Sequence, residues 1–119
     1  MKSIKQQVID ALQESKNYAR RIEDELHEHQ AEYTNGEKTF DPDLELQFQV
    51  FYNSRSSTIN PGEKSDDSFH AIQLYIDNLT DAQWTKSMKD AIDFNLEKIK
   101  KEIDEYAEKY KKQYPLNDE

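Results

Sequence analysis

The acidic stretch 23–29 holds the residues whose types and spacing are best suited to chemistry. Glu23 and His27 stand four residues apart, and so do Glu25 and His29. On a helix each pair lies on one face, where a carboxylate and an imidazole can hold a divalent metal ion. Each pair supplies only two of the three or four ligands of a zinc site, and no other His and Glu cluster completes the set. The stretch is also typical of a solvated acidic helix face, and we predict no metal site.

A catalytic centre is harder to assemble from these residues. His70 could serve as a general base, because imidazole titrates near neutral pH. The chain has no cysteine, however, and no serine stands in the Gly-x-Ser-x-Gly setting of an activated nucleophile. The only glycines, Gly36 and Gly62, are too few for a phosphate-binding loop. We interpret His70 as a histidine at the edge of the core, and we predict a protein that is not an enzyme, with no catalytic residue and no cofactor.

Two long amphipathic helices are expected to position these groups. Apolar residues recur at helical spacing over about 3–33 and again over about 80–113. Thr80 and Gln83 have the spacing of a capping box, which predicts that the second helix begins there. Its apolar stripe consists of Trp84, Met88, Ile92, Leu96, Ile99, Ile103, Tyr106 and Tyr110. The stripe must be covered, and the first helix, of similar length, is the natural cover.

Between the helices the apolar period changes from 3.6 to two, which predicts a strand over about 44–52. The stretch 69–77 is its only candidate partner, although Phe69, Ile72 and Ile76 also match a helical period. We choose a strand there, because a lone strand would leave its backbone groups unpaired. The predicted fold is therefore α+β, mainly α: two long antiparallel helices with an intervening two-stranded antiparallel β-hairpin.

The whole chain, 1–119, is expected to form a single domain. Residues 53–68 are rich in Ser, Asn, Asp, Pro and Gly, a composition that predicts a mobile surface loop. Asn35-Gly36 is interpreted as the stop of the first helix, although the same pair could form a tight hairpin turn. Residues 115–119 are expected to fray. Two helices and a hairpin leave some apolar surface uncovered, so we also predict a homodimer.

The location of the protein is predicted from what its sequence lacks. The N-terminal residues have no apolar core of a signal peptide, and no apolar run approaches the length of a membrane span. The absence of cysteine suits a reducing compartment. We predict a cytoplasmic protein with no membrane association.

The charge balance points away from nucleic acid. The chain has 16 basic and 25 acidic residues, a net charge of -9, whereas binding to a phosphate backbone needs clustered Lys and Arg. The lysines of residues 98–112 are interleaved with glutamates, which is typical of a solvated helix face. The excess is greatest over residues 34–80, which carry eight acidic and three basic residues. We predict no direct contact with nucleic acid, and a partner protein with a basic surface instead.

The residues expected to contact that partner are acidic groups of the middle segment and three aromatic rings. Phe51 and Tyr75 fall on the polar sides of their predicted strands, and Phe94 lies opposite the apolar stripe of its helix. Aromatic rings exposed beside carboxylates can form a contact surface. The full set is Asp41, Asp43, Glu45, Phe51, Glu63, Asp66, Asp67, Tyr75 and Phe94.

Two functions of different classes fit this sequence. The first is a small acidic intracellular protein-binding module that docks on a basic, nucleic-acid-binding surface of a partner. Inhibitors and immunity-type proteins of phages and mobile elements are modules of this kind. The alternative is a structural or assembly protein that oligomerises through its helical stripes, in the manner of a coiled coil.

Overall fold

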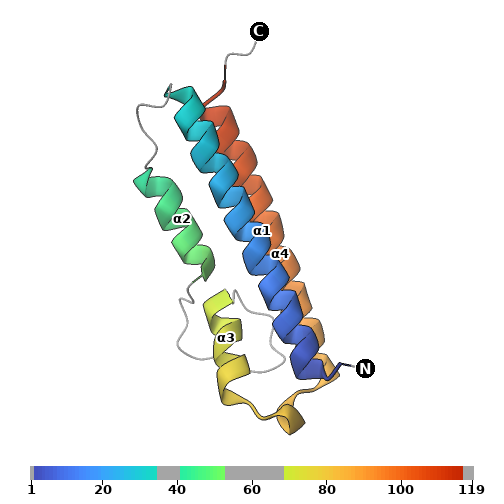
Figure 1. Ribbon diagram of the computed structural model, residues 1–119. Coiled ribbons are helices and arrows are strands. Elements are labelled where there is room, and N and C mark those ends of the chain that lie inside the picture. Colours follow the sequence, from blue (N-terminus) through green and yellow to red (C-terminus); the bar gives the residue numbers. More distant parts are fainter. Residues whose placement is uncertain (1, 35–40, 53–68, 117–119) are drawn as a thin grey trace.

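The computed structural model describes residues 2–34, 41–52 and 69–116. Within these ranges the chain forms four α-helices and one 3-10 turn, and no strand. The elements are α1 (Ile4–Tyr33), α2 (Pro42–Tyr52), α3 (Phe69–Asn78), η1 (Asp81–Gln83) and α4 (Lys86–Gln113). The long helices α1 and α4 lie side by side, and α2 and α3 follow one another along their flank (Figure 1).

The long helices α1 and α4 run in the same direction, so the predicted antiparallel pairing is wrong. Lys5, in the first turn of α1, lies 3.6 Å from Asp81, just before α4. At the other end, Gln30 of α1 contacts Tyr110 of α4. This arrangement is possible because α2 and α3 both run opposite to α1 and return the chain to its starting end (Figure 1). The result is an up-down-up bundle whose descending rod consists of two short helices.

The predicted β-hairpin is also wrong, and with it the α+β class, because both segments are helical. In the segment predicted as strand 44–52, the buried residues are Leu44, Phe48 and Phe51, which recur at helical spacing. Leu46, whose place in the alternation suggested a strand, is 59% exposed. The apparent alternation of apolar and polar residues over 44–50 therefore does not reflect a strand. It arises because this helix carries one leucine, Leu46, on its outer face.

Helix α2 also has a start signal. The Asp41 carboxylate accepts hydrogen bonds from the backbone N–H groups of Asp43 (3.0 Å) and Leu44 (3.4 Å), as an N-cap does. Pro42 follows as the first helical residue, where its missing N–H would have had no partner. The Asp41-Pro42 pair is therefore a helix start signal, which the prediction of a strand over 44–52 did not take into account.

Helix α3 replaces the second predicted strand, 69–77. Its buried residues are Phe69, Ala71, Ile72 and Tyr75. Phe69 and Ile72 belong to the helical period that the sequence offered as the alternative, and that alternative is what the structure contains. A strand was expected here only as the partner of a strand over 44–52, and the structure has a helix, α2, at that place.

Helix α4 begins later than predicted. Thr80 and Gln83 do interact, the backbone N–H of Thr80 donating to Gln83 Oε1 at 2.8 Å, but they close the 3-10 turn η1. Trp84 then adopts an extended conformation and is buried. Thr85 is the true N-cap, its hydroxyl accepting a hydrogen bond from the Met88 N–H at 3.2 Å.

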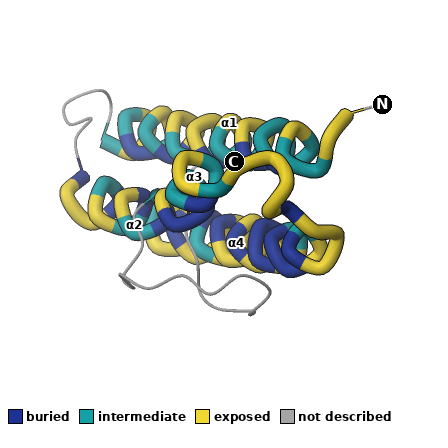
Figure 2. Tube along the Cα trace, turned by 90° about the horizontal axis from the view of Figure 1, so that it is seen from below, coloured by how far each residue is buried: buried dark blue, intermediate teal, exposed yellow. Residues whose placement is uncertain are grey.

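The core lies where the three rods face one another. Figure 2 shows buried residues on the sides of α1 and α4 that face each other, and others on α2 and α3. The stripe residues Ile92, Leu96, Ile99 and Ile103 of α4 are all buried within the chain. Rings from α2 and α4 meet edge to face, with Phe48 and Tyr106 6.1 Å apart between centroids. Burial of this apolar surface is the main source of stability for such a bundle.

Several predictions fall on residues outside the described ranges. The expected loop 53–68, the turn at Asn35-Gly36 and the last residues, 117–119, are among them. Helix α4 ends at Gln113, with Tyr114 as its C-cap. No helix of the described ranges combines the length and the apolar character that crossing a membrane requires.

Candidate functional site

Charge is strongly segregated along α1 and α2. Residues 2–21 carry five basic and two acidic residues, whereas residues 22–34 carry five acidic residues and neither Lys nor Arg. Residues 41–52, which lie beside the second half of α1, add three acidic residues and again neither Lys nor Arg (Figure 1). Helix α4 differs, because residues 86–113 carry eight basic and seven acidic residues. One side of the bundle is therefore acidic at the end where α1 stops and α2 starts.

We call the solvent-accessible part of this region the acidic surface. Five of its carboxylates are exposed and two, those of Glu23 and Glu45, are partly buried. The members are Glu23, Asp24, Glu25, Glu28, Glu32, Asp43 and Glu45.

The placement of these carboxylates is not explained by the stability of α1. The C-terminal end of a helix carries a partial negative charge, so nearby Lys or Arg stabilises it and Asp or Glu does not. The last turn of α1 contains no basic residue and includes Glu32. A negatively charged helix end costs a few tenths of a kcal/mol to about 1 kcal/mol. A binding role for these carboxylates would account for this arrangement.

Two large apolar side chains lie exposed within the same region. Leu46 of α2 is 59% exposed and Tyr33, the last residue of α1, is 46% exposed. Leu46 directly follows Glu45 and lies one helical turn after Asp43, so this exposed apolar side chain has carboxylates as neighbours on its own helix. An apolar centre with a charged rim is the usual anatomy of a protein-binding surface. The sequence analysis missed Leu46, although the helical period of its neighbours would have placed it on the outer face.

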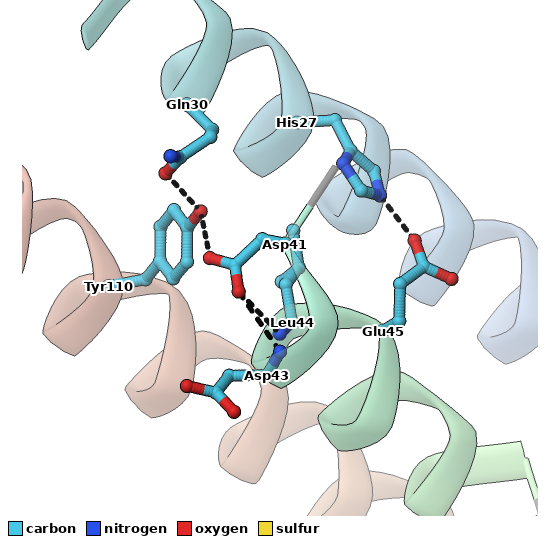
Figure 3. A network of polar contacts seen from close by, with 7 residues as sticks. All are labelled: His27, Gln30, Asp41, Asp43, Leu44, Glu45 and Tyr110. Carbon is cyan, nitrogen blue, oxygen red and sulfur yellow. Dashed lines mark hydrogen bonds and ion pairs between the residues drawn. The ribbon is translucent and has the colours of Figure 1, made fainter. Parts of the chain in front are cut away.

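Asp41 was expected to contact a partner, but the structure places it inside the protein. Besides capping α2, its carboxylate accepts a hydrogen bond from the Tyr110 hydroxyl at 2.8 Å (Figure 3). The same hydroxyl lies 2.6 Å from Gln30 Oε1. A hydroxyl has one proton, so it serves one acceptor at a time, and exchanging the amide O and N of Gln30 would satisfy both contacts. Asp41 thus links α2 to α4, and Tyr110 extends the network to α1 through Gln30.

Glu45 faces α1 rather than solvent alone. Its Oε1 lies 2.8 Å from Nε2 of His27, and Glu23 is the third member of a cluster whose donor atoms all lie within 4.8 Å of one another. Figure 3 shows His27 and Glu45 reaching toward each other from α1 and α2. Partial burial, followed by the negative charge of Glu45, raises the pKa of Glu23 above its usual value.

The other predicted contact residues are scattered. Phe51 and Tyr75 belong to the core, so their expected exposure, which assumed strands, is wrong. Phe94 is 49% exposed, but it lies in the third turn of α4, toward the opposite end of the bundle. Glu63, Asp66 and Asp67 lie outside the described residues. Of the nine predicted residues, the structure brings Asp43 and Glu45 together on the acidic surface.

His70 does not lie at a core edge in a strand, as predicted, because it is exposed near the start of α3. A separate cleft of about 750 Å³ lies between α1 and α4 and is lined in part by Tyr18, Glu97 and Lys100. Among its lining residues, Tyr18 has a defined hydrogen bond, in which its hydroxyl donates to the Asp104 carboxylate. That hydrogen bond and burial raise the pKa of Tyr18 to about 12, so the phenol stays protonated at neutral pH. Such a phenol is not poised to act as a base or a nucleophile.

The arrangement therefore offers a binding surface more readily than a reaction centre. Its carboxylates are spread over two helices instead of converging on one reacting atom, and α2 carries an exposed leucine beside two of them in sequence. Comparison with protein-family models, with curated proteins and with solved structures found no match to this chain.

Proposed function

We propose that the protein is a small acidic binding module that acts in the cytoplasm by docking the acidic surface on a basic surface of another protein. The observation that carries this proposal is the charge segregation. Residues 22–34 and 41–52 hold eight carboxylates with neither Lys nor Arg, and seven of the eight lie on the acidic surface. A surface of one sign attracts a partner of the opposite sign and accelerates their association.

The chemistry of the partner follows from that of the surface. Clustered Lys and Arg are the mark of proteins that bind nucleic acid, so a nucleic-acid-binding protein is the partner class that fits best. By covering the nucleic-acid-binding surface of this partner, the module would block nucleic-acid binding, as an inhibitor or immunity-type protein does. Leu46 would enter an apolar pocket at the centre of the contact, while Asp43, Asp24 and Glu28 would pair with basic residues around it.

The alternative, assembly through the helical stripes, receives no specific support. The stripe of α4 is covered within a single chain, where Ile92, Leu96, Ile99 and Ile103 are all buried, and α1 is the helix packed most extensively against it. The stripe is therefore not a free surface for a second copy.

The test is capture of partners from the source cells, with defined variants. Asp24→Lys combined with Glu28→Lys reverses two exposed charges on the acidic surface. Glu14→Lys combined with Glu97→Lys makes the same charge change at the cleft between α1 and α4, and serves as the matched control. We expect the first pair to weaken binding of a basic partner by about tenfold or more at low salt, and the control to weaken it far less.

A second comparison tests the apolar centre. Leu46→Ser and Phe94→Ser each remove an exposed apolar side chain, one within the acidic surface and one far from it. We expect only Leu46→Ser to weaken binding. Equal retention of the partner by the wild type, the charge-reversed variant and Leu46→Ser would overturn the proposal.

A further inference from the structure

A cluster of three metal-ligating side chains bridges α1 and α2. Glu23 and His27 lie one turn apart on the side of α1 that faces α2, and Glu45 reaches them from the first turn of α2. All three ligand atoms lie within 4.8 Å of one another. Of these, His27 Nε2 and Glu45 Oε1 are 2.8 Å apart (Figure 3). The sequence offered only the first two of these residues, because Glu45 was assigned to a strand.

The geometry suits a small ion with nitrogen and oxygen ligands. Zinc binds imidazole and carboxylate at roughly 2.0–2.2 Å, so ligand atoms around a tetrahedral zinc lie about 3.3 Å apart. That separation falls between the shortest and longest distances in the cluster. Side-chain rotations are needed to bring all three atoms to that separation, and the Glu45 side chain, which is 44% exposed, has room to make one. Three protein ligands with a water molecule in the fourth position is a common form of zinc site.

The composition of the cluster selects among metals. An imidazole ligand disfavours Ca²⁺ and Mg²⁺, which prefer oxygen alone, and suits Zn²⁺ and its neighbours in the first transition row. The electrostatics agree, because the partly buried carboxylate of Glu23 lies close to a second carboxylate, that of Glu45. A divalent cation would compensate the repulsion between Glu23 and Glu45.

We propose that Glu23, His27 and Glu45 form a Zn²⁺ site that fastens α2 to α1. Helix α2 has 11 residues, and a helix of this length is only marginally stable by itself. A metal ion held by both helices would therefore stabilise the folded chain over the unfolded one, which lacks the preformed site. The site stands independently of the proposed partner, since it needs no second protein.

The experiment is a calorimetric titration of the chelator-treated full chain with Zn²⁺, paired with thermal unfolding. We expect one equivalent of Zn²⁺ to bind and the Tm to rise with Zn²⁺ concentration. His27→Gln and Glu45→Gln should each weaken binding by about tenfold or more. Co²⁺ in place of Zn²⁺ should give the intense visible absorption of a four-coordinate ion.

Matched controls remove the same residue types elsewhere. His70→Gln removes an exposed histidine, and Glu25→Gln breaks the other pair with the same spacing. We expect both to bind Zn²⁺ as the wild type does. Circular dichroism checks that each variant is helical. If His27→Gln fails to fold, the Zn²⁺ affinity of Glu45→Gln alone tests the proposal. No saturable binding, or unchanged affinity in Glu45→Gln, would overturn the proposal.

Discussion

At the scale of single residues, Asp41 illustrates the difference between the charge of a residue and its role. It was predicted to contact a partner because it is acidic and lies in the most acidic segment. In the structure it caps α2 and accepts a hydrogen bond from Tyr110, and it is almost fully buried. Glu45, four residues later, stays at the surface and approaches His27. Sequence alone could not separate the two, because the separation depends on how α2 packs against α1 and α4.

The Tyr110 hydroxyl is predicted to be important for stability. Tyr110→Phe removes the hydroxyl group at the centre of a buried network and leaves the Asp41 carboxylate and the Gln30 amide without that partner. We expect the free energy of unfolding in urea to fall by about 1–3 kcal/mol. Tyr33→Phe, at a ring that is 46% exposed, is the control and should change it much less.

The pH dependence provides a second readout for the same variant. Burial first, and then the hydrogen bond to Asp41, raise the pKa of Tyr110 above the usual 10.0. The folded state then holds this proton more tightly than the unfolded state does. The corresponding stabilisation is complete below pH 10 and is lost as the pH rises toward the folded pKa. Above pH 10 the unfolding free energy of Tyr110→Phe should fall less steeply than that of the wild type, and an equal slope would contradict this account.

At the scale of elements, length decides how well the sequence predicts structure. The long periods over 3–33 and 80–113 allow only a helix, and α1 and α4 lie there. Over 44–52 the same apolar residues satisfy both a period of two and a helical period, because Leu44 and Phe48 are common to both patterns. The Asp41 cap and the packing of Phe48 against Tyr106 select the helix. Both are tertiary or capping effects that periodicity does not report.

The start of α4 is predicted to depend on Thr85. Thr85→Ala removes the side-chain acceptor of the Met88 N–H and should lower the free energy of unfolding by about 1 kcal/mol. Thr80→Ala, which alters only the 3-10 turn, should have a smaller effect. Urea unfolding of both variants checks the order, and a larger loss for Thr80→Ala would mean that the helix begins where the sequence first indicated.

At the scale of the whole molecule, the parallel course of α1 and α4 determines which charges meet. With antiparallel helices, the basic first half of α1 would lie beside the second half of α4. In the observed bundle the acidic second half of α1 lies beside α2, whose described residues add more carboxylates. The sequence indicated a negative middle segment and an acidic helix face at 23–29, but not that the two lie side by side. Their proximity depends on the direction in which α2 runs along α1, which no local pattern encodes.

The acidic surface is the central claim, and hydrogen–deuterium exchange of the protein in complex with its captured partner tests it most directly. We predict slower exchange in the second half of α1 and in the first turns of α2, around Leu46, with little change in the turns of α4 around Phe94. Protection confined to α4 or to the cleft near Tyr18, with α2 exchanging as in the free protein, would contradict the account.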